Sequence, residues 1–189
     1  MKQSLGAEVY AMPTPVWIVG SYDAEGKPNV MTVAWGGVCC SKPPSIAISL
    51  RKATYTFDSI VERKCFTVSI PSETHAKEAD FFGMVSGRDV DKFEATGLTP
   101  VRSELVDAPY VGEFPLILEC RVTHTLEIGL HTQFVGEILD VKADPAVLVG
   151  GKPALDKVLP LLYGTGGKSY FRSGGFVGKG FSIGRGYMR

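Results

Sequence analysis

Residues 28–56 read PNVMTVAWGGVCCSKPPSIAISLRKATYT and place polar side chains, glycines and two cations between hydrophobic, strand-like runs. The side chains of residues 30–35 alternate between two faces, because successive residues of a strand point to opposite sides. One face is mixed and consists of Val30, Thr32 and Ala34. The other is bulky and consists of Met31, Val33 and Trp35. We expect the bulky face to pack in a core and the mixed face to leave room for a ligand. Gly36 and Gly37 are expected to end the strand.

A second alternating run, residues 45–50, ends in the polar segment RKATYT at residues 51–56. Thr56 or Asp58 is expected to cap a helix there, and the free N–H groups and dipole of a helix start favour an anion. Two cations and three hydroxyl groups at this point fit a phosphate. The alternative is a strand–turn–helix junction whose Arg51 and Lys52 are only solvated.

A second candidate anion cradle is the loop MVSGR at residues 84–88. It is expected to connect a helix over residues 73–82, capped by Ser72, with a helix over residues 90–96, capped by Asp89 and ended by Gly97. Lys92 would lie one turn into the second helix. A simple helix–helix turn with exposed charges is the alternative.

The rest of the chain predicts many strands and few, short helices. Turn residues predict a hairpin of residues 15–22 and 28–35 around Asp23–Gly26, and a second hairpin of residues 115–127 and 131–142 around Gly129. Residues 65–70 form a further strand. The core candidates in the second hairpin are Val122, Phe134, Val135, Ile138 and Val141. This pattern indicates a mainly β fold with short helices, either a barrel or a sandwich.

Length and composition exclude several classes of protein. A chain of 189 residues with 44% hydrophobic content fits one domain, or one domain plus an arm, and no apolar stretch approaches a membrane span. No secretion signal is visible, so a cytoplasmic location is expected. Equal numbers of acidic and basic residues, 20 of each, argue against nucleic acid or membrane as the main partner. Residues 171–189 form a glycine-rich, aromatic and basic C-terminal arm, which could bind RNA or pack across a partner subunit.

Familiar catalytic and metal motifs are missing. The sequence has no complete P-loop, GxSxG, HExxH or GxGxxG motif, and the cysteine spacing makes a metal site improbable. The neighbouring Cys39 and Cys40 suggest either redox chemistry or small core residues, and Cys65 and Cys120 are expected in the core. Of three histidines, His75 and His124 are expected at the surface, whereas His131 would stand at the rim where loops meet.

Five segments in order resemble the flavin reductase-like proteins with an FMN-binding split barrel. They are TPVWIVGSYDAEGKPNVMTVAWGG, SKPPSIAISLRKATYT, FFGMVSGRDVDKF, APYVGEFPLILEC and HTQFVGEI, and the resemblance extends from about Tyr10 to about Tyr170. It implies one domain over residues 1–189 with a Greek-key split β-barrel, a homodimer, and one noncovalently bound FMN in each subunit.

The resemblance also implies roles for individual residues. Asn29, Thr32 and Ala34, with the adjacent Met31 and Val33, would lie along the isoalloxazine ring, and Cys40 and Ser41 close to its polar edge. The ribityl chain and phosphate would be held by Arg51, Lys52, Thr54, Tyr55 and Thr56, with Ser86, Arg88 and Lys92 at the phosphate end.

His131 is the candidate catalytic residue, because related flavin reductases carry a histidine near the nicotinamide after a Gly-Asp pair. Here the pair is Gly129 and Leu130, so the carboxylate that could orient the imidazole is missing. Three functions follow as alternatives. The first is an FMN protein that carries electrons between protein partners, the second an NAD(P)H:flavin oxidoreductase, and the third a binding module that stores flavin or uses the basic arm.

Overall fold

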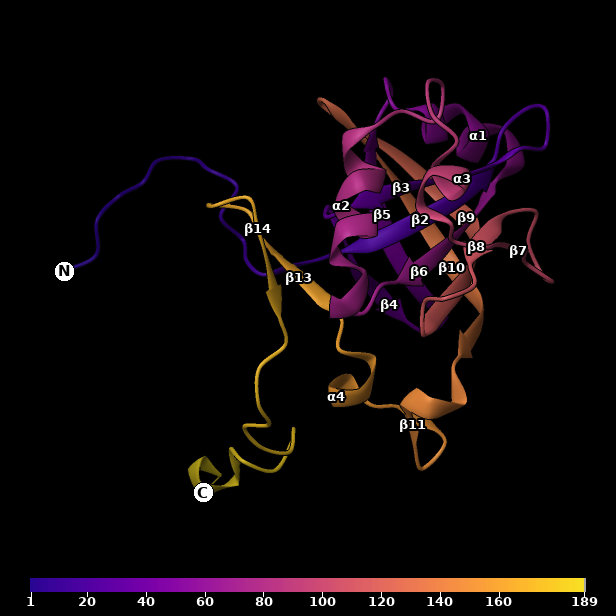
Figure 1. Cartoon of the computed structure of the whole chain (residues 1–189). Coiled ribbons are helices and arrows are strands. Elements are labelled where there is room, and N and C mark those ends of the chain that lie inside the picture. The colour runs from indigo at the N-terminus through magenta and orange to yellow at the C-terminus, as the bar shows by residue number, and fades with distance from the viewer. Residues whose placement is uncertain (189) are drawn as a thin grey trace.

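The computed structural model describes residues 1–188 and is dominated by one antiparallel sheet (Figure 1). Its seven strands lie in the order β3-β2-β6-β9-β10-β5-β4, so β3 and β4 are the edges. The strands are β2 (Trp17–Tyr22), β3 (Pro28–Val33), β4 (Gly36–Ser41), β5 (Pro44–Arg51), β6 (Cys65–Ile70), β9 (Leu116–Ile128) and β10 (His131–Ala143). The predicted mainly β fold with short helices is confirmed, and the hairpins β2–β3 and β9–β10 form as expected.

The remaining elements are short. The α-helices are α1 (Tyr55–Arg63), α2 (Ala76–Met84), α3 (Lys92–Thr96) and α4 (Leu155–Val158), and the 3-10 helices are η1 (Glu73–His75), η2 (Pro145–Val147) and η3 (Arg185–Tyr187). Three small sheets pair β1 (Thr14–Pro15) and β14 (Ser169–Arg172) with β13 (Leu161–Gly164), β7 (Pro100–Arg102) with β8 (Pro109–Val111), and β11 (Leu148–Val149) with β12 (Lys152–Pro153).

The large sheet has a hydrophobic core on each of its two faces. On the inner face, Val33 of β3 packs in the same cluster as Ile46 of β5, although the two strands are far apart in the sheet order. The sheet therefore curls around this core as a split barrel. On the outer face, Ile18 and Val30 pack against Phe82 of α2 and Phe93 of α3. Strand β2 is buried on both faces, which explains the apolar run of Trp17, Ile18 and Val19 at its start.

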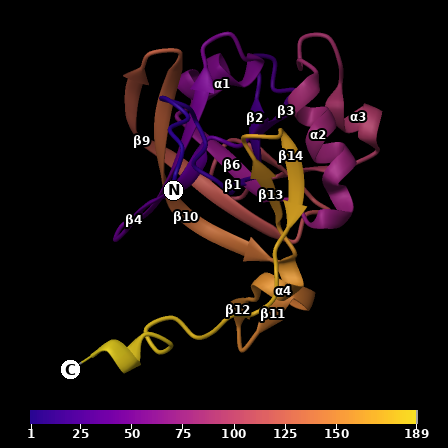
Figure 2. The same cartoon turned by 90° about the vertical axis from the view of Figure 1, so that its left-hand side faces the viewer.

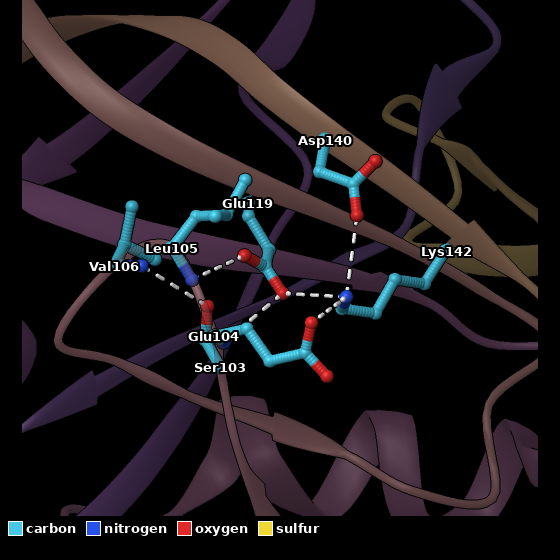
Figure 3. Close-up of polar contacts among 7 residues, drawn as sticks. All are labelled: Ser103, Glu104, Leu105, Val106, Glu119, Asp140 and Lys142. Carbon is cyan, nitrogen blue, oxygen red and sulfur yellow. Dashed lines mark hydrogen bonds and ion pairs between the residues drawn. The ribbon is translucent and has the colours of Figure 1, made fainter.

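A buried carboxylate anchors the loop between β7 and β8 to the sheet (Figure 3). Glu119 of β9 is fully buried and accepts hydrogen bonds from the backbone N–H groups of Leu105, at 2.9 Å, and Glu104. The ammonium group of Lys142 lies 3.5 Å from Glu119 and 3.2 Å from the carboxylates of both Glu104 and Asp140. These contacts satisfy a charge that would otherwise be costly to bury.

The structure corrects several details of the predicted elements. Strand β3 ends at Val33, and Gly36 and Gly37 begin β4 instead of ending the earlier run. Trp35, expected in the core, is 39% exposed, because the chain leaves β3 before it. Of the core candidates in β9–β10, Phe134 is buried, Val122 and Ile138 are partly buried, and Val141 is exposed.

The predicted helix starts are also displaced. Helix α1 begins after Thr54, not at Thr56 or Asp58, and α3 is capped by Asp91 instead of Asp89. The Asp91 carboxylate accepts from the N–H groups of Phe93 and Glu94. Gly97 ends α3 with a positive φ of 70°, as predicted.

Both ends of the chain extend away from the body (Figures 1 and 2). Residues 1–13 are exposed, and the predicted C-terminal arm begins with the last residues of β14. Large apolar side chains of the arm are strongly exposed, among them Phe176, Val177, Phe181 and Tyr187. Residue 189, the last of the predicted arm, lies outside the described residues.

Candidate cofactor site

Two adjoining cavities lie between the ends of β3 and β5, helix α2 and the loop that follows it. The larger has a volume of about 390 Å³ and the smaller about 260 Å³. Their common walls are formed by Met31, Thr32, Thr54, Gly83 and Met84. The two cavities therefore form one elongated site with two chemically different ends.

The larger cavity is lined mainly by apolar and aromatic side chains. On one side, the rings of Trp35 and His131 stack with centroids 6.4 Å apart and planes inclined by 21°. On another side, the hairpin β13–β14, which lies beside α2 in Figure 2, carries Tyr163 and Tyr170 of the cavity wall. The Tyr170 hydroxyl donates to the Asp80 carboxylate at 2.9 Å, which fixes the hairpin against α2. Such walls suit a flat aromatic ring system.

The smaller cavity is more polar than the larger one and is built mainly by the start of α1 and residues 86–88. The first N–H groups of α1, at Tyr55 and Thr56, have no carbonyl acceptor within the helix. The Arg88 guanidinium lies over the Tyr55 ring, 5.2 Å from its centroid, and donates to the Ala53 carbonyl at 3.2 Å. A helix start beside an arginine is a favourable place for a phosphate.

Two buried side chains shape this polar end. The Asn29 amide donates to Thr56 Oγ1 at 2.9 Å, which leaves the Thr56 hydroxyl hydrogen free to donate. Lys92 is 4% exposed, and its ammonium group donates to the carbonyl oxygens of Val30 and Phe82, each at 2.8 Å. Burial lowers the pKa of Lys92 from 10.5 to about 8. No carboxylate neutralises Lys92 in residues 1–188, so a bound anion would be its counterion.

Most of the sequence-predicted site residues line these cavities. The larger cavity has Met31, Thr32, Val33, Ala34, Arg51, Thr54 and His131 in its walls. The smaller has Met31, Thr32, Thr54, Tyr55, Thr56, Ser86, Arg88 and Lys92. The two phosphate-binding segments proposed from the sequence thus lie side by side, although α1, β6, η1 and α2 separate them along the chain.

Four predicted residues lie outside the cavity walls. Asn29 is one layer below the cavity, under Thr56. Lys52 is exposed and its ammonium group is paired with Glu127 of β9. Cys40 and Ser41 pair with Ser45 and Pro44 at the far end of β5, whereas the cavity meets β5 at residues 49–51. Four residues of strand span roughly 13 Å, so Cys40 and Ser41 lie away from the larger cavity of this chain, and their contact with the ring edge stays a prediction.

Sequence reasoning missed several cavity residues. They are Val16, Trp35, Ser49, Leu50, Asp80, Gly83, Tyr163 and Tyr170 in the larger cavity, and Phe82 in the smaller. Ala53, Met84, Val85 and Gly87 belong to the two segments predicted to bind an anion, although they were not singled out as ligands. Two of the missed residues, Asp80 and Tyr170, come together across 90 positions of the chain. For Trp35, the available sequence signal was the alternation of residues 30–35. It assigned Trp35 to a core, whereas the structure places Trp35 in the cavity wall.

The cysteines divide into two pairs. Cys65 and Cys120 are buried, as predicted, and burial raises the pKa of both thiols. Cys39 and Cys40 are both exposed, so their interpretation as small core residues is wrong. Within residues 1–188, no group of three or more His, Cys, Asp or Glu side chains is arranged to hold a metal ion.

The predicted positions of the histidines are partly confirmed. His124 is exposed on β9, whereas His75 is only partly exposed because its ring packs 5.0 Å from that of Phe114. His131, the predicted catalytic residue, lies in the cavity wall at the start of β10.

Comparison with known proteins identifies the relatives of this fold. The sequence model of the family described as "Flavin reductase like domain" matches residues 9–171. The solved structure of the flavoredoxin of Desulfovibrio vulgaris (Miyazaki F) superposes with a TM-score of 0.93 and 52% identity, covering 97% of this chain and 100% of that one. Flavoredoxin from Methanosarcina acetivorans superposes with a TM-score of 0.89 and 34% identity, covering 100% and 98% of the two chains. High molecular weight rubredoxin of Moorella thermoacetica is 34% identical over 115 residues, which are 60% of this chain and 47% of that protein.

Proposed function

Since the chain belongs to the flavin reductase-like family, we propose that it is a redox protein that binds FMN noncovalently and carries electrons between protein partners. Two of its relatives are flavoredoxins and a third is a high molecular weight rubredoxin, all named as redox proteins. The observation that carries the proposal is the pair of joined cavities, one with aromatic walls and one with cationic and hydroxyl groups.

The polar end has the composition required by a phosphate dianion. Arg88 and Lys92 supply two positive charges without a carboxylate partner among the described residues, and the start of α1 supplies N–H donors. Gly87 allows the loop to approach, because a Cβ atom there would overlap with Asn29 and lie 2.6 Å from Tyr55 Cδ1. These residues would hold the phosphate and the adjacent ribityl chain.

The aromatic end would hold the ring system. Bound FMN supplies reversible electron transfer, and the protein positions it and sets its environment. Trp35 and His131 form one stacked wall, and Met31, Val33 and Ala34 of the β3 end form the floor. Tyr163 and Tyr170 restrict the approach of solvent from the side of α2.

The alternative function is an NAD(P)H:flavin oxidoreductase. It is favoured by His131, whose ring lies in the cavity wall where a second substrate could approach. The residue before it is Leu130, which is 66% exposed and provides no carboxylate to orient the imidazole. The electron carrier is therefore the first choice, and direct reduction by a nicotinamide is the second.

We also propose that two copies of the chain form a homodimer. Outward-facing apolar side chains support it, since Leu126 is 57% and Ile128 50% exposed on β9 beside the larger cavity. The apolar side chains of the C-terminal arm offer a second contact surface. No helix in the described part of the chain is long and apolar enough to span a membrane. The cytoplasmic location expected from the sequence stays a prediction.

The proposal is tested by titrating the flavin-free protein with FMN and with riboflavin, following flavin fluorescence. We expect saturable binding with one FMN per chain and weaker binding of riboflavin, because riboflavin lacks the phosphate. The variant Trp35→Ala should weaken the binding of both flavins by a similar factor, because both contain the ring. The control Leu130→Ala, at an exposed apolar residue beside the site, should bind as the wild type does. No saturable binding of FMN would refute the proposed function.

A further inference from the structure

Asp23 links the turn between β2 and β3 to the start of α1. Its carboxylate is buried, with Oδ1 accepting from the N–H groups of Glu25, at 3.0 Å, and Lys27, at 2.8 Å. These two bonds are those of an aspartate that stabilises a turn. The second oxygen, Oδ2, makes a different contact, since it accepts from the Tyr55 hydroxyl at 2.8 Å.

Tyr55 therefore faces the smaller cavity with its ring and not with a free hydroxyl. The hydrogen bond that the Tyr55 hydroxyl donates to Asp23 is the main cause that raises the pKa of Tyr55. The ring supports Arg88, whose guanidinium lies 5.2 Å from the ring centroid, and it packs against Gly87. The loop of residues 86–88 thus rests on the Tyr55 ring.

Arg88 needs this support to point in a fixed direction. Its one hydrogen bond from the guanidinium to another residue, at 3.2 Å to the Ala53 carbonyl, leaves most of its donors unpaired among the described residues. A long side chain held by one hydrogen bond samples several rotamers. A ligand that fixes it in one rotamer removes this conformational entropy, and the loss weakens binding. Stacking on a ring that is itself fixed restricts the guanidinium before the ligand arrives.

We infer that Asp23 is a positioning residue for phosphate recognition: by holding the Tyr55 hydroxyl it fixes the ring that carries Arg88, and so favours FMN over riboflavin. The inference rests on the proposed function, because it concerns the phosphate end of the same site. Asp23 does not line either cavity and acts only through Tyr55 and Arg88.

Other contacts also hold the turn between β2 and β3. The effect of the Tyr55–Asp23 hydrogen bond on flavin binding can therefore be measured without unfolding the protein. Arg63 donates to the carbonyl oxygens of Tyr22, at 2.9 Å, and Asp23, and pairs with Asp107. The variant Tyr55→Phe leaves these contacts and the bonds to Asp23 Oδ1 in place. It removes one hydroxyl group and keeps the aromatic ring.

The test measures the dissociation constants of FMN and riboflavin for the full-length wild type, Tyr55→Phe and Asp23→Asn. We expect Tyr55→Phe to weaken FMN binding about three- to tenfold, the loss typical of one hydrogen bond, while riboflavin binding changes less than about twofold. Asp23→Asn should act in the same direction. Tyr110→Phe, in the remote strand β8, is the matched control and should change neither constant. If Asp23→Asn fails to fold, Tyr55→Phe alone carries the test.

A double-mutant cycle with Arg88→Gln distinguishes positioning from a general structural role. We expect Tyr55→Phe to have little further effect on FMN binding once Arg88 has been replaced. Equal losses for FMN and riboflavin, or full additivity with Arg88→Gln, would overturn the inference while leaving the proposed function intact. A wild type that binds both flavins equally well would also overturn it. A wild type that binds neither would refute the proposed function itself.

Discussion

Gly87 and Asn29 lie so close together that Gly87 has no room for a side chain: a Cβ atom on Gly87 would overlap with Asn29 Oδ1. Asn29 cannot move aside easily, because its amide donates to the buried Thr56 hydroxyl. The contact joins β3, the start of α1 and the loop of residues 86–88 around the polar cavity. The polar cavity can therefore keep its shape only with glycine at position 87.

Replacing Gly87 tests this requirement. We expect Gly87→Ala to push the loop away and to weaken FMN binding by roughly tenfold or more, as overpacking of a well-fitted contact costs about 1–3 kcal/mol. Isothermal titration calorimetry measures the change. Gly37→Ala is the control, because a Cβ atom there would have open space. Unchanged affinity in Gly87→Ala would show that the loop does not contact the ligand.

Of the four cations predicted from the sequence at the phosphate end, Arg88 and Lys52 differ in their position in the structure. Arg88 lines the polar cavity, whereas Lys52 is paired with Glu127 outside it. We expect Arg88→Gln to weaken FMN binding by about 10- to 100-fold, the loss of a charge-assisted contact. Lys52→Gln should weaken it by less than about threefold, which is within the range of an exposed ion pair. Lys179→Gln, in the C-terminal arm, is the control in the same fluorescence titration, and a larger loss for Lys52→Gln than for Arg88→Gln would contradict the assignment.

Lys92 predicts a pH dependence of FMN binding. Its pKa of about 8 in the flavin-free protein means that it loses its proton as the pH rises through that value, and with it the charge that attracts the phosphate. We expect FMN affinity to fall above pH 8, and binding between pH 8 and 9 to take up protons, measured by calorimetry in buffers of different ionisation enthalpy. The variant Lys92→Met should bind more weakly and without proton uptake, and proton uptake that persists in the variant would contradict the assignment.

The same low pKa predicts how the stability of the flavin-free protein depends on pH. The unfolded chain binds the Lys92 proton more tightly than the folded chain, since its pKa there is the ordinary 10.5. The contribution of Lys92 to the free energy of unfolding therefore increases as the pH rises from about 8 to 10.5. Denaturant titrations of wild type and Lys92→Met isolate this contribution, and an opposite slope of the difference would contradict it.

Glu119 stabilises the fold and lines neither cavity. Glu119→Ala removes a fully buried carboxylate and leaves the N–H groups of Glu104 and Leu105 without their acceptor, so we expect the free energy of unfolding to fall by about 2–5 kcal/mol. FMN affinity should not change in the fraction that folds. Glu104→Ala, at an exposed carboxylate beside the same Lys142, should have a much smaller effect on stability. Equal stability losses in the two variants, measured by urea denaturation, would contradict this account.

The sequence predicted the strands well because their signals are local. Strand β6 has the predicted bounds, and the turns at Asp23–Gly26 and Gly129 separate paired strands as expected. The phosphate end was also accessible, because hydroxyl and cationic residues cluster within short segments. In each of these cases the deciding residues are close in the sequence.

The remaining parts of the site depend on contacts between distant segments. A hydrogen bond to Asp80 holds Tyr170 at the cavity, and no local sequence pattern predicts such a pair. Lys52 turns away from the cavity because Glu127 of a neighbouring hairpin offers a partner. The register of β4 and β5 places Cys40 away from the larger cavity of this chain. Side-chain direction and strand register are properties of the assembled sheet.

The central claim is that the protein carries electrons through bound FMN and receives them from another protein. Anaerobic stopped-flow absorbance in the flavin band tests it most directly, with the FMN-loaded protein mixed separately with NADH, NADPH and dithionite. We predict rapid bleaching by dithionite and no bleaching on the same time scale by either nicotinamide. Rapid bleaching by NADH or NADPH at low concentrations would contradict the claim and identify the protein as an NAD(P)H:flavin oxidoreductase.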